Sequence, residues 1–108
     1  MDSDKSVFIE FMGDTPATRL LDFLITGRDF DYTLTDLAMK AGMSWSTLHR
    51  IFPKFVHNNI VVEVREVGRA KLYKLNIHNL FVQKLVDLYD VLLSQELKNS
   101  VEREMIAV

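Results

Sequence analysis

Apolar residues recur along this 108-residue chain at the spacing of a helix in five segments and at the spacing of a strand in two. An apolar stripe at every third or fourth residue is typical of a half-buried helix, whereas alternation at every second residue is typical of a half-buried strand. The pattern therefore predicts a mainly α domain with one small β-hairpin, an α+β fold. The predicted helices cover residues 6–12, 16–26, 33–41, 44–58 and 80–98, and the predicted strands cover residues 60–66 and 70–76.

The centre of the chain, residues 33–59, predicts two helices joined by a short turn. Thr33 is a suitable N-cap for the first helix, and Asp36 stands three residues later, near the capping-box position, where a carboxylate also suits the helix dipole. Gly42 tolerates the left-handed backbone that ends a helix, and Ser44 is a second N-cap. Two amphipathic helices with a glycine-containing turn form a helix-turn-helix unit.

Pro53 lies inside the second helix of this unit. An interior proline costs about 3 kcal/mol and removes one backbone hydrogen bond. Because the apolar spacing continues on both sides of Pro53, we expect one kinked helix rather than two separate helices. Asn59 follows the helix and is expected to adopt the left-handed backbone conformation, which asparagine tolerates better than most residues.

The segments before the helix-turn-helix unit also carry capping signals. Ser6 precedes a short apolar segment that predicts a helix, although its residues would also suit a strand. Thr15, with Pro16 at the first helical position, predicts the start of a second helix, which ends at Gly27. The polar link that follows predicts a short bridge strand at residues 30–32.

A predicted hairpin follows the helix-turn-helix unit directly, with Gly68 and Arg69 at its turn. Within the unit, the order Thr-x-x-Asp-Leu-Ala, Ala-Gly-Met-Ser and Ser-Thr-Leu resembles the core of winged helix-turn-helix transcription regulators. Archaeal-type regulators are the most similar, and FMGDTPATRLLDFLI resembles their opening helices. The resemblance implies that the second helix enters the major groove of DNA and that the hairpin is the wing. Pro53 departs from the family pattern, and so does Asn59, which stands where the family usually has glycine.

The net charge of −2 argues against nucleic-acid binding, but the distribution of charge argues for it. Residues 41–78 hold six basic and two acidic residues, a net charge of +4, whereas residues 1–40 carry −4 and residues 79–108 carry −2. Positive charge is thus concentrated in the segment that would face phosphate. A segment of +4 is modest, so one copy alone is expected to bind DNA weakly.

The candidate DNA-contacting residues lie off the apolar face of the second helix and on the hairpin. Arg50 is the best candidate for reading a base, because a guanidinium pairs bidentately with a guanine edge. Trp45 would pack either on sugar or a thymine methyl group, or back on Lys40 or Met43. For each polar candidate the alternative is an ordinary solvated side chain. The full set is Trp45, Ser46, Thr47, His49, Arg50, Lys54, Arg69 and Lys71.

The last predicted helix has more apolar residues than one buried face needs. Residues 1–78 therefore form the predicted DNA-binding domain, and residues 79–108 form a C-terminal helix of the same domain, expected to end near Lys98 and to mediate homodimerisation. The alternative is that residues 6–12 cover the surplus face within the same chain. The predicted dimer-interface residues are Phe81, Leu85, Leu88 and Leu92.

Other functional classes find little support in the sequence. The chain has no cysteine, its three histidines are not spaced to share a metal ion, and it has no glycine-rich phosphate loop or nucleophile elbow, so we expect neither an enzyme nor a cofactor. No apolar run reaches the roughly 18 residues of a membrane helix, so a cytoplasmic protein is expected. The prediction is a sequence-specific double-stranded DNA-binding regulator. Its alternatives are a winged-helix protein-interaction module and a non-specific architectural DNA binder.

Overall fold

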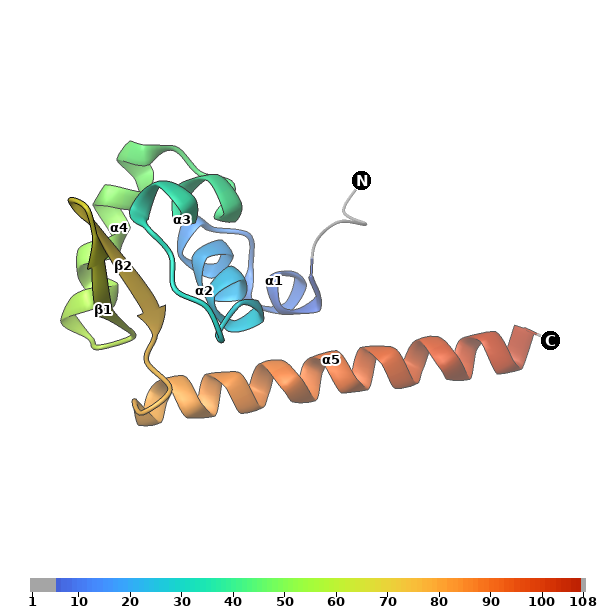
Figure 1. Cartoon of the computed structure of the whole chain (residues 1–108). Coiled ribbons are helices and arrows are strands. Elements are labelled where there is room, and N and C mark those ends of the chain that lie inside the picture. Colours follow the sequence, from blue (N-terminus) through green and yellow to red (C-terminus); the bar gives the residue numbers. More distant parts are fainter. Residues whose placement is uncertain (1–5, 108) are drawn as a thin grey trace.

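The computed structural model describes residues 6–107, which form five helices and one antiparallel hairpin (Figure 1). The order of the elements is the one that the apolar pattern predicts. A mainly α fold with a small β-hairpin is thereby confirmed. The elements are α1 (Val7–Met12), α2 (Pro16–Thr26), α3 (Leu34–Ala41), α4 (Trp45–His57), β1 (Val61–Val67), β2 (Ala70–Leu75) and α5 (Leu80–Ala107).

The core lies where α2, α3 and α4 meet one another and the hairpin. Leu20 and Leu24 of α2 are essentially inaccessible, as are Leu37 of α3 and Leu48 of α4. The first part of α5 closes this core with Val82, which is also fully buried. In Figure 1, α5 runs along one side of the body and extends beyond it toward the C-terminus.

Every predicted N-cap is confirmed. The hydroxyl of the capping residue accepts a hydrogen bond from the backbone N–H three residues later, and Asp36 completes a capping box with Thr33. Gly42 ends α3 with φ 71°, the left-handed conformation that glycine adopts without strain. The guanidinium of Arg19 donates to the carbonyl oxygen of Gly42 at 3.1 Å, so the turn between α3 and α4 is tied to α2. The capping residues are Ser6, Thr15, Thr33 and Ser44.

Helix α4 continues through Pro53 as a single helix, as the apolar spacing predicts. Leu48, Phe52 and Phe55 are its buried residues, on both sides of the proline. Asn59 follows with φ 57°, which confirms the predicted left-handed residue. A kink at Pro53 stays a prediction.

The hairpin pairs Val61 with Leu75 and Val67 with Ala70, one residue from the predicted strand ends. The register shifts between Glu63 and Arg65, so Val64 is an extra residue that interrupts the strand alternation. Tyr32 adds the predicted bridge strand: its backbone N–H and C=O pair with those of Tyr73, both at 2.8 Å. The wing is therefore attached to the loop that precedes α3.

Helix α5 is longer than predicted. It begins after Asn79, whose side chain accepts from the N–H of Val82, and it ends at Ala107 rather than near Lys98. The helix continues because the segment after Lys98 contains no glycine or proline, and Arg103 pairs with Glu96, about two turns earlier, at 3.5 Å. Val108 lies outside the described residues.

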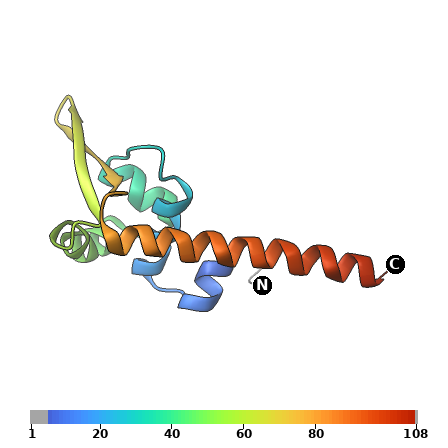
Figure 2. The same cartoon turned by 90° about the horizontal axis from the view of Figure 1, so that it is seen from below.

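Helix α1 covers part of α5. This agrees with the alternative in which residues 6–12 cover the surplus apolar face of the last helix within the same chain. Phe8 is fully buried, and its ring lies 5.4 Å from that of Tyr89. Seen from below, α5 still passes well beyond the rest of the chain (Figure 2). Among the described residues, no helix is both long and apolar enough to cross a membrane.

Candidate nucleic-acid interface

The solvent-facing side of α4 carries cationic and polar side chains. Ser46, Arg50 and Lys54 are all exposed. Within residues 6–107, neither Arg50 nor Lys54 forms an ion pair or a side-chain hydrogen bond. Their charges are thus available to an external ligand.

The first turn of α4 contains a stacked pair of aromatic side chains. The rings of Trp45 and His49 lie 3.9 Å apart at an angle of 45°, and His49 Nδ1 is 3.2 Å from the carbonyl oxygen of Trp45. Half of the Trp45 surface remains exposed. The sequence indicated Lys40 or Met43 as an intramolecular partner for Trp45, whereas the structure places His49 against it. Lys40 instead places its ammonium group over the ring of Tyr32.

The hydroxyl groups of Ser46 and Thr47, two of the candidate DNA-contacting residues, belong to the capping network at the start of α4. Ser44 Oγ accepts from the N–H of Thr47 at 3.1 Å and donates to Thr47 Oγ1 at 2.9 Å. Ser46 Oγ lies 3.2 Å from the same Ser44 oxygen. Thr47 is half-buried, so its hydroxyl supports the helix start, whereas Ser46 is more accessible to a ligand.

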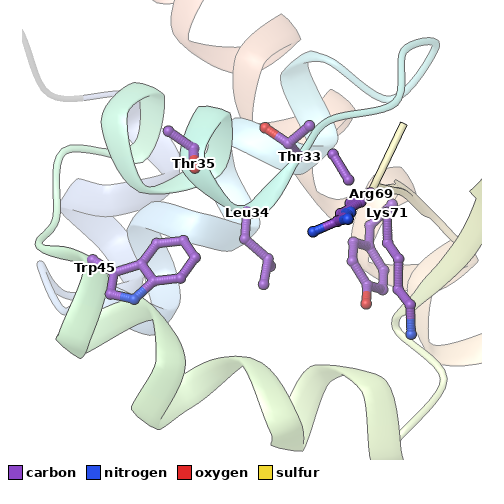
Figure 3. A pocket seen from close by; sticks show the side chains of 8 residues that line it. Thr33, Leu34, Thr35, Trp45, Arg69 and Lys71 are labelled. Atoms are coloured by element: carbon purple, nitrogen blue, oxygen red, sulfur yellow. The ribbon is translucent and has the colours of Figure 1, made fainter. Parts of the chain in front are cut away.

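A groove joins the start of α4 to the wing (Figure 3). It holds about 280 Å³. In Figure 3, Trp45 stands on one side, Arg69 and Lys71 stand on the other, and Leu34 lies between them. Arg69 and Lys71 therefore share one concave surface with the first turn of α4. The groove is lined by Thr33, Leu34, Thr35, Trp45, Arg69, Ala70, Lys71 and Tyr73.

Two of the six basic residues in the 41–78 segment are paired with acidic residues. Arg65 donates two hydrogen bonds to Asp31, at 2.6 and 3.1 Å; this contact lowers the pKa of Asp31 and raises the pKa of Arg65. Lys71 lies 3.9 Å from Glu63, a loose pair between exposed groups. Arg65 is therefore used to hold the wing to the loop before α3, a role that local sequence patterns do not reveal.

A second, mostly apolar groove of about 430 Å³ runs along α4. Its walls include both His49 and His57, which lie eight residues apart on the helix. Among residues 6–107, no three His, Cys, Asp or Glu side chains are placed to hold a metal ion. The lining residues are Leu34, His49, Phe52, Pro53, Val56 and His57.

The four predicted dimer-interface residues differ in burial. Leu85 belongs to the core of its own chain, with 8% of its surface exposed, and Leu92 is half-buried against that core. Phe81 and Leu88 are exposed. Leu85 is therefore buried by its own chain rather than by a second copy, because the side of α5 that carries it faces α1 and α2. Beyond it lies an exposed apolar stripe that the sequence analysis did not separate out: Leu93, Leu97, Val101 and Met105.

The capped helix pair α3–α4, the hairpin that follows it and the bridge strand at Tyr32 define the winged helix-turn-helix fold, here with a long additional C-terminal helix. The fold expected from the sequence is thus confirmed. On this fold, α4 occupies the position of the recognition helix and the β1–β2 hairpin occupies the position of the wing.

Solved structures of transcription regulators share this fold. AntR, an antimony-specific transcriptional repressor, matches 85% of this chain and 78% of its own at 20% identity and a TM-score of 0.59. MepR, a regulator of the Staphylococcus aureus multidrug efflux pump MepA, matches 92% and 76% at 13% identity and a TM-score of 0.61. A possible transcriptional regulator from Methanosarcina mazei matches 86% and 84% at 22% identity and a TM-score of 0.51. No protein-family model and no curated protein matches the sequence.

Proposed function

We propose that this protein is a cytoplasmic transcription regulator that binds double-stranded DNA sequence-specifically as a homodimer. The observation that carries the proposal is the groove in which Arg69 and Lys71 of the wing lie opposite the first turn of α4. Two cationic side chains of the wing and the half-exposed Trp45 of α4 line one concave surface. Such a surface fits the phosphate backbone that runs between two grooves of a duplex.

The dimensions of DNA suit this arrangement. The major groove of B-DNA is about 12 Å wide and admits one α-helix, so α4 enters it with its exposed side facing the bases. Arg50 then reads a guanine edge, while Lys54 and Ser46 contact base or phosphate. Arg69 at the turn of the wing contacts the adjacent backbone or the minor groove.

The dimer follows from the part of α5 that extends beyond the body. At a rise of 1.5 Å per residue, a 28-residue helix is about 42 Å long, and most of the stability of a helix in a protein comes from packing of its apolar face. The stripe of Leu93, Leu97, Val101 and Met105 is exposed in the described chain. We propose that a second copy covers it, with Phe81 and Leu88 adding to the contact. A dimer also binds DNA more tightly than one copy, whose 41–78 segment carries a net charge of only +4. Once one copy is bound to the duplex, binding of the second copy becomes intramolecular.

The comparisons support the proposal at the level of the fold. AntR and MepR are transcriptional regulators with the same arrangement of helices and wing. Their identities to this chain lie at 20% and 13%, so the residues that would contact DNA have to be argued from this chain itself.

The experiment that tests the proposal is the salt dependence of binding to duplex DNA. Fluorescence anisotropy with labelled random and promoter duplexes should give binding constants that fall steeply as salt rises, because each neutralised phosphate releases counterions. Promoter duplexes that contain a preferred site should bind more tightly than random ones. Equal affinity for every duplex would favour the non-specific architectural binder. Absence of binding at low ionic strength would favour the protein-interaction module instead, with Trp45 and the apolar groove along α4 as its contact surface.

A further inference from the structure

The pair formed by Trp45 and His49 fixes which nitrogen of the histidine carries the proton. His49 Nδ1 lies 3.2 Å from the carbonyl oxygen of Trp45. A carbonyl oxygen only accepts hydrogen bonds, so Nδ1 must donate. In the neutral ring the proton is therefore on Nδ1, and Nε2 is left with a lone pair. The indole of Trp45 also packs against the imidazole, with the ring centroids 3.9 Å apart and the ring planes tilted by 45°.

A contact between His49 and a base requires the imidazole to be accessible near the residues proposed to meet the bases. His49 is exposed in the first half of α4, one residue before Arg50. Within residues 6–107, Nε2 forms no hydrogen bond. In the major groove, adenine and cytosine present amino donors, whereas guanine presents only the acceptors N7 and O6. A lone pair at Nε2 thus matches adenine or cytosine and opposes guanine.

Protonation reverses this preference without moving the ring. An imidazole takes up its second proton between about pH 5 and pH 8 in ordinary surroundings. The bond from Nδ1 to the Trp45 carbonyl is the same in both forms, so the ring keeps its place, while Nε2 changes from acceptor to donor. A donor matches guanine N7 or O6, thymine O4 and adenine N7, and it opposes cytosine, which presents only an amino donor.

The charged groups around the ring come from two elements. Helix α4 contributes Arg50, the next residue, and His57, which lines the same apolar groove. Helix α3 contributes only the apolar Leu34 to that groove. The wing contributes Arg69 and Lys71 to the neighbouring groove, on the far side of Trp45. No carboxylate lines either groove.

We infer that His49, held by Trp45, is a specificity-determining residue whose base preference depends on pH. The inference rests on the proposed DNA binding. The neutral ring accepts cytosine and disfavours guanine at one position of the site, whereas the protonated ring accepts guanine and disfavours cytosine there. A regulator built in this way changes its preferred sequence as the pH falls.

The first test uses the free protein and needs no DNA. The ¹⁵N chemical shifts of the imidazole, recorded at pH 8 on uniformly labelled protein and assigned with His49→Gln, should show the Nδ1–H tautomer. An Nε2–H tautomer would overturn the inference and would leave the proposed DNA binding untouched.

The second test selects duplexes from a random library at pH 8 and at pH 5.5. For the unmutated protein, the ratio of cytosine to guanine selected at one position should fall between pH 8 and pH 5.5 by about fivefold or more, the usual effect of one mismatched position. The His49→Ala variant should show one preference at both pH values. The matched control is His57→Ala, an exposed histidine on the same helix and groove, which should keep the change. A base preference that is independent of pH in the unmutated protein would refute the inference alone, whereas selection of no duplex at either pH would refute the proposed function.

Discussion

Substitution of Leu97 by glutamate should dissociate the proposed dimer. Leu97 lies in the middle of the exposed stripe on α5, and 61% of its surface is accessible in the single chain. Because Leu97 has no place in the core of its own chain, and glutamate is a good helix former, the variant should fold as the unmutated protein does. The change therefore reports on association rather than on folding.

The expected loss of dimer stability follows from the exposed fraction of the Leu97 side chain. Full burial of a leucine contributes about 1.5–3 kcal/mol, so covering the exposed part contributes about 1–2 kcal/mol by the same measure. A twofold dimer contains this contact twice. Loss of both copies costs about 2–4 kcal/mol, which raises the dimer Kd by about 30-fold to 900-fold. A buried carboxylate adds a further cost because it has no partner on an apolar stripe.

Sedimentation velocity at micromolar concentrations measures the effect. Gln95→Glu is the matched control: it adds the same charge at an exposed residue of the same helix, about 160° around the axis from Leu97. Circular dichroism checks that both variants keep their helix content. If the unmutated protein sediments as a monomer at tens of micromolar, or if Leu97→Glu remains a dimer with unchanged Kd, the assignment of a second copy to this stripe is wrong.

Two pairs of substitutions test the division of labour at the DNA surface and the packing of Tyr32, which attaches the wing. Arg50→Ala should cost about 1–3 kcal/mol on the preferred site and relax base preference, whereas Arg69→Ala should weaken all duplexes evenly in anisotropy titrations; an even loss for Arg50→Ala would show that it only positions the protein. Gly27→Ala should destabilise the fold by about 1–3 kcal/mol in urea denaturation, the usual cost of overpacking, because the added methyl group would overlap the hydroxyl of Tyr32. Tyr32→Phe removes that hydroxyl and should recover part of the loss, so strictly additive effects would refute the clash.

Local sequence signals predicted the helix starts and the turns, because these features depend on residues three or four apart. Thr33 and Ser44 cap their helices through hydroxyl groups that act on the nearest free N–H groups. Gly42 and Asn59 adopt the left-handed backbone for equally local steric reasons. The resemblance to winged-helix regulators includes Thr33, Gly42 and Ser44, which explains why it led to the correct fold.

Features that depend on distant contacts were not accessible from local patterns. The pairing of Arg65 with Asp31 joins residues 34 positions apart, so Arg65 was counted among the charges facing phosphate. The burial of Leu85 depends on where α1 and α2 pack against α5. The end of α5 was misplaced for a different reason: Asn99 and Ser100 are weak helix formers, but no residue after them stops a helix.

The same contacts that bury one side of α5 also connect the proposed dimer to the proposed DNA-binding surface. The hydroxyl of Thr26, the last residue of α2, donates to the carbonyl oxygen of Asp22, so the hydroxyl of Tyr89 on α5 donates to Thr26 at 2.8 Å. Arg28 adds an ion pair with Asp90 at 3.3 Å.

These bonds fix α5 to α2, and α2 packs directly against α3 and α4. The direction of α5 relative to the recognition helix is therefore set within each chain. In a twofold dimer joined through α5, the angle at which the two helices cross then determines the separation of the two copies of α4. Half-sites one turn of DNA apart require a separation of about 34 Å, so the interface on α5 selects the spacing of the operator while α4 selects its bases.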